Sequence, residues 1–128
     1  MNIGKYIGLP YSLRPMPGCV NCWGLVALVY SQEKSEEIPI FKSNSTAGIA
    51  AAFTAAFAAD DHGFYKVELP QDYDVIIFIN DSVNRSEYHC GIYYNGKVLH
   101  AGRALGGSVY QDIDVAKETF NRVEFWRL

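Results

Sequence analysis

The sequence has few cysteines, no long apolar run and no excess of positive charge, and each shortage excludes a class of protein. Only 3 of its 128 residues are cysteines, an odd number that is too small for a disulfide scaffold. No run of about 18 apolar residues occurs, so no membrane span is predicted. Lysine and arginine total 11 against 14 acidic residues, and the formal net charge of −3 gives no electrostatic case for a nucleic-acid partner.

What remains is the composition of an ordinary globular protein, 49% hydrophobic and 20% charged. The length predicts one domain that spans residues 1–128. The first eight residues lack the apolar stretch of a secretion signal. We therefore expect the chain to be made and kept in the cytosol, or to leave it as part of an assembly.

Two helices are predicted after an irregular arm at residues 1–21 that is rich in glycine and proline. Residues 22 to about 32 are apolar on nearly every side, which is typical of a buried helix. Asn21 precedes them and is a good N-cap. Residues 45–59 carry an apolar side chain every fourth position and predict a second helix, which the segment 60–63 ends.

From residue 64 onward the pattern indicates β-strands, with a strongly apolar and β-branched run that is typical of a central strand. The expected strands are residues 64–69, 73–79, 89–94, 97–101, 108–113 and 122–127. Helices come first and an antiparallel sheet follows, so the sequence predicts an α+β fold with N-terminal helices packed on a central sheet.

The turn Asn95-Gly96 sets the register of one hairpin. If it is a two-residue turn, Gly91 lies opposite His100, and His89 points to the same face as His100. The two histidines then become diagonal neighbours, with room between their rings because Gly91 has no side chain. One ring nitrogen of His89 could bond His100 while the other faces a thiol. The alternative is a pair of histidines with no catalytic role.

Cys22 is the candidate nucleophile, because a thiol at a helix N-terminus lies near unpaired backbone N–H groups that favour the thiolate. Cys90 is interpreted as a small core residue on the other face of its strand. Cys19 creates a Cys-x-x-Cys spacing with Cys22. A redox pair, a zinc site with His89 and His100, and a regulatory disulfide that silences Cys22 stay open as weaker readings.

Several other polar residues are expected to have structural roles. The acidic residues at element ends are interpreted as caps, turns and solvated surface, and His62 as exposed and incidental. These acidic residues are Asp60, Asp61, Asp72 and Asp74.

Five segments together resemble the NlpC/P60 family of papain-like cysteine peptidases, in order and spacing through most of the chain. They are Leu9-Pro10-Tyr11, Asn21-Cys22-Trp23-Gly24-Leu25-Val26, residues 73–78, His89-Cys90-Gly91-Ile92-Tyr93 and Val98-Leu99-His100-Ala101. The compact length and the segment Cys-Trp-Gly-Leu-Val most resemble the NlpC/P60 proteins of phage tail assembly. Two departures are Asn21, where the family commonly has aspartate, and Cys90, where it has a small aliphatic residue.

The resemblance implies a papain-like NlpC/P60 fold and a cysteine peptidase or amidase that cuts the γ-D-glutamyl–diamino acid bond of peptidoglycan stem peptides. By matching position, Cys22 is the nucleophile, His89 the general base and His100 the residue that orients its imidazole. Tyr11 matches a tyrosine whose hydroxyl helps to hold the oxyanion. The implied chemistry needs no metal or organic cofactor.

The implied partners are the peptidoglycan peptide substrate and other phage tail proteins, with no nucleic acid and no membrane span. Three alternatives keep the same fold. The first is a non-enzymatic tail component that uses its groove only for binding. The second is an acyltransferase with a lipid or thioester donor, and the third is a secreted antibacterial amidase effector.

Overall fold

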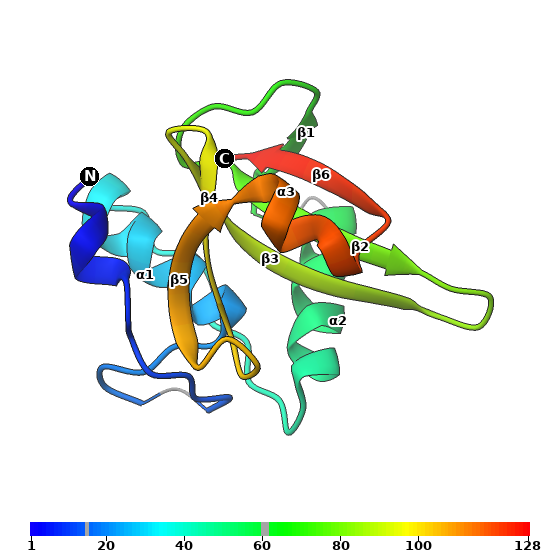
Figure 1. Ribbon diagram of the computed structural model, residues 1–128, viewed down its shortest axis with the longest axis horizontal. Helices are drawn as coiled ribbons and strands as arrows, with labels where there is room; N and C mark the ends of the chain where they lie inside the picture. Colours follow the sequence, from blue (N-terminus) through cyan, green and yellow to red (C-terminus); the bar gives the residue numbers. More distant parts are fainter. Residues whose placement is uncertain (15, 60–61) are drawn as a thin grey trace.

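The computed structural model describes residues 1–14, 16–59 and 62–128, and Figure 1 gives the arrangement of its elements. Pro15 of the arm and the acidic pair Asp60 and Asp61 lie outside the described residues, as do the predictions made for them. The elements are η1 (Ile3–Tyr6), α1 (Cys22–Lys34), α2 (Thr46–Ala58), β1 (Tyr65–Val67), β2 (Val75–Asp81), β3 (Ser86–Tyr94), β4 (Lys97–Gly102), β5 (Gly107–Asp112), α3 (Ile113–Ala116), η2 (Lys117–Thr119) and β6 (Arg122–Arg127).

The strands form one antiparallel sheet in the order β1-β6-β2-β3-β4-β5. The predicted α+β class, with the two long helices ahead of the sheet, is confirmed. The strand β2 is central and buried on both faces from Val75 to Ile79, as its apolar run predicted. The strand β3 begins at Ser86, three residues before the expected start, because it continues its pairing with β2 out to Asp81.

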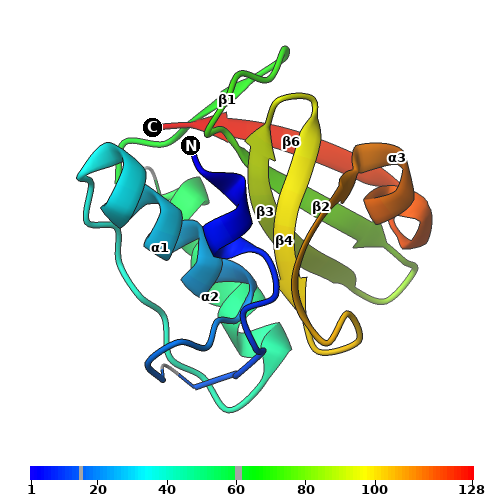
Figure 2. The ribbon, with the colours of Figure 1, turned by 60° about the vertical axis from the view of Figure 1, so that its left-hand side comes forward.

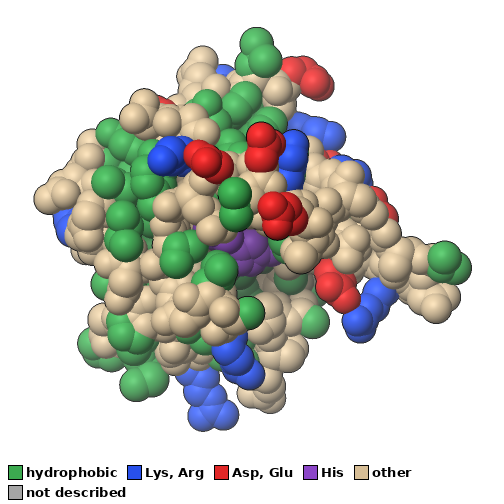
Figure 3. Space-filling view, viewed as in Figure 1, with side chains coloured by type: hydrophobic (Ala, Val, Ile, Leu, Met, Phe, Trp, Pro, Cys, Tyr) green, Lys and Arg blue, Asp and Glu red, His purple; other side chains and the backbone are tan. Residues whose placement is uncertain are grey.

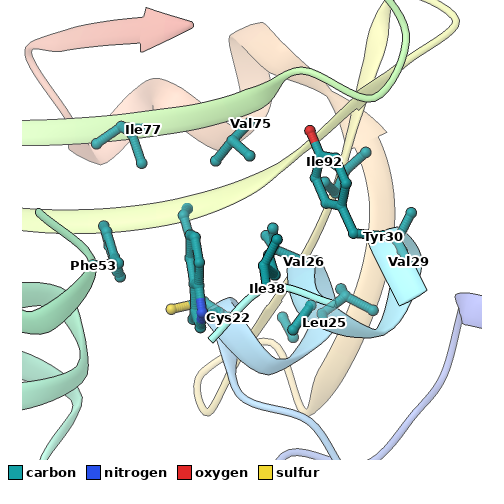
Figure 4. Packing of buried hydrophobic residues seen from close by; sticks show 14 of the residues in the cluster. Cys22, Leu25, Val26, Val29, Tyr30, Ile38, Phe53, Val75, Ile77 and Ile92 are labelled. Carbon is teal, nitrogen blue, oxygen red and sulfur yellow. The ribbon is translucent and has the colours of Figure 1, made fainter. Parts of the chain in front are cut away.

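The helices α1 and α2 cover one face of the sheet, and the short helix α3 lies on the other side (Figure 2). The larger core lies between α1, α2 and the sheet, where Trp23 stacks on Phe53 with ring centroids 5.5 Å apart. Figure 4 shows this layer, with Leu25, Val26 and Val29 of α1 facing strand residues. Burial of such side chains contributes about 1.5–3 kcal/mol each.

The segment after β5 departs from the sequence prediction. Residue 113 was expected to end a strand, but it begins α3, and η2 follows. Ile113, Ala116 and Phe120 pack against a second apolar cluster of Ile76, Phe78 and Val98 on this face of the sheet. The central strands are apolar on both faces, so the second face also needs a cover, and this segment supplies it.

The N-terminal arm is tied to the edge of the sheet. The backbone N–H of Ser108 in β5 donates to Leu9 O, and that of Gly8 donates to Ser108 O, both at 2.9 Å. Tyr6 is 1% exposed and anchors the arm in the core, whereas its neighbour Ile7 is exposed and does not. In the described part of the chain, no helix is both long enough and apolar enough to cross a bilayer.

Acidic residues near the sheet have the structural roles that the sequence suggested. The buried Asp74 accepts from the backbone N–H of Gln71 and forms an ion pair with Arg127 at 2.8 Å. Asp72 accepts from the backbone N–H of Asn95 at 2.8 Å and so supports the β3–β4 turn. His62 is exposed, as expected.

Candidate active site

Cys22 is the first residue of α1, and the predicted cap is confirmed. The Asn21 side-chain oxygen accepts from the backbone N–H of Gly24 at 2.6 Å. This bond satisfies one of the free N–H groups of the first turn and fixes where the helix begins. Cys22 is 4% exposed, and its sulfur lies in the same packed layer as Phe53 (Figure 4).

Asn21 makes a second bond that aspartate could not make. Its amide nitrogen donates to the backbone carbonyl of Leu13 at 2.9 Å and so holds the N-terminal arm against the start of α1. Because a carboxylate only accepts, aspartate at this position would keep the cap and lose the bond to the arm. The contact with Leu13 therefore gives a structural reason for asparagine at this position.

The substitution Asn21→Asp is therefore expected to lower the free energy of unfolding by about 1–3 kcal/mol, because the new carboxylate faces a carbonyl oxygen with no donor between them. The measurement is urea unfolding followed by fluorescence. The matched control is Ser45→Asp at the cap of α2, where the side chain accepts from Gly48 N alone and a change within about 0.5 kcal/mol is expected. Equal losses at both caps would contradict the role given to Leu13.

A small cavity of about 30 Å³ gathers three of the four predicted site residues. Cys22, His89 and Tyr11 all line it, from the start of α1, from β3 and from the arm. The remaining lining residues are Leu13, Asn21, Thr46, Ile49, Ala101 and Gly102. The cavity has room for little more than a water molecule, so it could hold one reacting group while the rest of a ligand lies outside.

The β3–β4 hairpin has the register that the turn predicted. Tyr94 pairs with Lys97 and Gly91 with His100, and both turn residues have positive φ, 49° at Asn95 and 81° at Gly96. A Cβ atom at Gly91 would lie 2.9 Å from the Cβ of His100 and 2.8 Å from the Leu99 carbonyl oxygen. Glycine is therefore required at this position.

The two histidines are hydrogen-bonded, with His89 Nε2 and His100 Nδ1 2.8 Å apart. His100 is 3% exposed and lies one bond behind the cavity that His89 lines. The predicted contact between the rings is confirmed. The ring of His89 also stacks on Phe120, with centroids 6.0 Å apart, which restricts its orientation from the other side.

A residue that the sequence did not single out completes the arrangement. Gln111 of β5 lies with its side-chain oxygen 2.7 Å from His100 Nε2. It pairs with Val98, so it lies diagonally opposite His100 on the same face of the sheet. No local pattern marks it. Gln111 could be predicted only from the register of β4 and β5. The segment between these strands lacks a two-residue turn like the one that sets the register of β3 and β4.

Burial keeps His100 neutral at ordinary pH. Its pKa is lowered from 6.5 to about 4, mainly by burial and also by the neighbouring His89, while the bond to Gln111 opposes both effects. His100 is thus suited to accept or donate one hydrogen bond at each nitrogen without carrying charge.

The thiols of Cys22 and Cys90 interact, which the sequence reasoning missed. Hydrogen bonding from Cys90 holds the pKa of the Cys22 thiol well below its usual range, against the opposing effect of burial and with further help from His89. Burial and the neighbouring Cys22 raise the pKa of Cys90. Cys90 is fully buried in the core, as expected, but it also favours the thiolate form of Cys22.

Tyr11 lies at the mouth of the cavity. Its hydroxyl is 3.3 Å from Thr46 Oγ1, a contact that joins the arm to the start of α2. The Arg103 guanidinium lies 5.6 Å from the centre of its ring. The structure thus places Tyr11 and Cys22 on the lining of one cavity.

Cys19 lies apart from this cavity, half-buried in a larger groove between the arm and α1. All three cysteines are free thiols. Within residues 1–14, 16–59 and 62–128, no three His, Cys, Asp or Glu side chains are arranged to bind a metal ion.

Comparison with known proteins gives a structural match only. No protein-family model and no curated protein matches the sequence. Among solved structures, the chain is similar to the NlpC/p60 domain of the peptidoglycan hydrolase SagA, with a TM-score of 0.54 and 19% identity over 95% of this chain and 90% of that one. This chain has the NlpC/p60 fold. The fold expected from the sequence resemblance is therefore confirmed.

Proposed function

We propose that this NlpC/p60-like protein is a cysteine peptidase or amidase that hydrolyses peptidoglycan stem peptides at γ-D-glutamyl–diamino acid bonds. The observation that carries the proposal is the shared cavity of Cys22 and His89, with His100 bonded behind His89 at 2.8 Å. A low-pKa thiol beside an imidazole that is itself oriented by a third group is the arrangement of a cysteine hydrolase. The similarity to a peptidoglycan hydrolase domain supports the choice of substrate.

The proposed reaction runs through an acyl-enzyme. His89 accepts the thiol proton, and the Cys22 sulfur attacks the carbonyl carbon of the scissile amide. The backbone N–H of Cys22 and the hydroxyl of Tyr11 hold the oxyanion. His89 then donates its proton to the leaving amine and later activates the water that releases the acid. His100 stays neutral throughout and keeps the ring of His89 in place.

Cations that have no salt bridge to a described acidic residue favour an anionic substrate. Seven of the eleven lysines and arginines form salt bridges with described acidic residues. Arg14, Lys42 and Arg103 form none within the part of the chain that the structure describes. In Figure 3, Lys and Arg side chains (blue) lie near the lower end of β5, below the exposed histidine atoms (purple).

Two observations connect these cations with the cavity. Arg103 lies over the ring of Tyr11, which lines the cavity, and Arg14 directly follows the lining residue Leu13. Arg14 and Lys42 together line a second cleft of about 540 Å³. A γ-linked glutamyl residue keeps a free α-carboxylate, at the other end of its side chain from the scissile carbonyl. A carboxylate at that position would be attracted to this rim, which we define as Arg14, Lys42 and Arg103.

The double variant Arg14→Gln/Lys42→Gln is expected to raise KM for a stem peptide about tenfold with little change in kcat, because it removes attraction present in both the bound substrate and the transition state. The matched control is Lys34→Gln, another cation without a salt bridge among the described residues, which lies over the ring of Tyr73. Amidation of the substrate α-carboxylate should raise KM of the native protein by a similar factor and change KM of the double variant little. If the double substitution raised KM equally for the free and the amidated peptide, the rim would not bind the α-carboxylate.

The direct test of the function is digestion of purified peptidoglycan and its stem peptides, with products identified by mass spectrometry. Release of one fragment whose new ends lie at the γ-D-glutamyl bond is the expected result. A transfer product that forms only with an added acyl acceptor would instead favour an acyltransferase. The role in a phage tail, synthesis in the cytosol and the single-domain extent of residues 1–128 stay predictions from the sequence.

A further inference from the structure

Gln111 is the outermost member of a hydrogen-bond chain that ends at His89, which shares a cavity with the candidate nucleophile Cys22. Its side-chain oxygen is 2.7 Å from His100 Nε2, and His100 Nδ1 is 2.8 Å from His89 Nε2. His89 in turn lines the same small cavity as Cys22. The three side chains behind Cys22 come from three neighbouring strands, β3, β4 and β5.

The amide oxygen of Gln111 determines which ring nitrogens of His100 and His89 carry a hydrogen. A carbonyl oxygen only accepts, so His100 Nε2 carries a hydrogen and donates it to Gln111. A neutral imidazole carries one hydrogen, so His100 Nδ1 is bare and must accept. The donor is then the Nε2–H of His89.

By the same reasoning, one ring nitrogen of His89 is free to accept the proton of the thiol. With its hydrogen on Nε2, neutral His89 has a lone pair on Nδ1, the nitrogen that can face Cys22. After proton transfer, the imidazolium donates from both nitrogens, and His100 Nδ1 still accepts. The opposite orientation of the Gln111 amide would reverse every bond and place a hydrogen on His89 Nδ1, where it could not act as a base.

We propose that Gln111 is a positioning residue that holds His100 and His89 in the tautomers that leave His89 Nδ1 free to take the Cys22 proton. The proton passes from the Cys22 sulfur to His89 Nδ1 and forms a thiolate and an imidazolium, with no other reactant. The inference deepens the proposed function and rests on it for its biological meaning. The tautomers and the thiol reactivity can be measured without any peptidoglycan substrate.

Two measurements test the proposal. The first is a long-range proton–nitrogen NMR correlation of the imidazole nitrogens in the native protein, which identifies each tautomer. The second is the pH profile of Cys22 alkylation by iodoacetamide in the native protein and in Gln111→Leu, read by peptide mass spectrometry. The described titratable side chains that surround this reaction are His89 and Cys90 of β3, Tyr11 of the arm and His100 of β4.

The expected result is an Nε2–H tautomer for both histidines in the native protein. In Gln111→Leu, the midpoint of alkylation should rise by about one pH unit, which lowers the rate about tenfold at pH values below both midpoints. Gln111→Glu keeps an acceptor and should keep the His100 tautomer, while its charge raises the pKa of His100. The matched control is Tyr110→Phe, which removes a 2.7 Å side-chain bond to Tyr94 O from the same strand and should leave the profile unchanged.

An Nδ1–H tautomer of native His100 would overturn the proposal even if no variant folded. An unchanged profile in Gln111→Leu, or an equal change in Tyr110→Phe, would also overturn it. Failure of the native protein to cut peptidoglycan would count against the proposed function alone, because neither measurement involves that substrate.

Discussion

Replacing Cys22 with alanine is expected to lower amide hydrolysis by on the order of 10³-fold or more, because the reaction then has no nucleophile to form the acyl-enzyme. The side chain is small and 4% exposed, and its removal leaves the Asn21 cap intact. The measurement is the initial rate of fragment release from purified stem peptides, followed by mass spectrometry under identical conditions for both proteins.

The matched control is Cys19→Ala, which removes a thiol three residues earlier that does not line the Cys22 cavity. It should retain the native rate. Cleavage that survives in Cys22→Ala would show that another group or another protein performs the reaction. No cleavage by the native protein, together with a Cys22 thiol that iodoacetamide does not label, would favour the reading of a non-catalytic binding groove.

The second large effect concerns stability and pH. The pKa of His100 is about 4 in the folded protein and near 6.5 when unfolded. Between these values the unfolded chain binds more protons, so stability falls as the pH falls. From pH 7.5 to pH 4.5, this one group is expected to lower the free energy of unfolding by about 2–3 kcal/mol.

The measurement is urea unfolding at several pH values in the native protein and in His100→Asn, which does not titrate in this range. The comparison uses the change with pH and not the absolute stability, because the variant also loses bonds to His89 and Gln111. A smaller loss on acidification in His100→Asn is expected. Parallel curves for the two proteins would show that His100 does not stay neutral in the fold.

Local chemistry made part of the site predictable. Asn21 caps the helix through a contact three residues away, and Asn95-Gly96 turns the chain within two residues, so both features depend on neighbours in sequence. Together they determined where Cys22 lies in its helix and that His89 meets His100. The buried run in β2 was equally clear, because its composition alone required burial on both faces.

Tertiary structure decided what lies around these groups. The Gln111 contact depends on how β5 aligns with β4 across residues 103–106, and the contact of Cys90 with Cys22 depends on how α1 packs on β3. The helix α3 replaced the end of an expected strand because the apolar face at Phe78 and Val98 needed a cover. Each of these is a contact between segments far apart in the chain, so its free energy depends on the packing of the whole domain and no short pattern encodes it. The sequence by itself therefore determined the nucleophile's helix and the histidine pair, and only the fold brought them to one cavity and supplied Gln111 and Cys90.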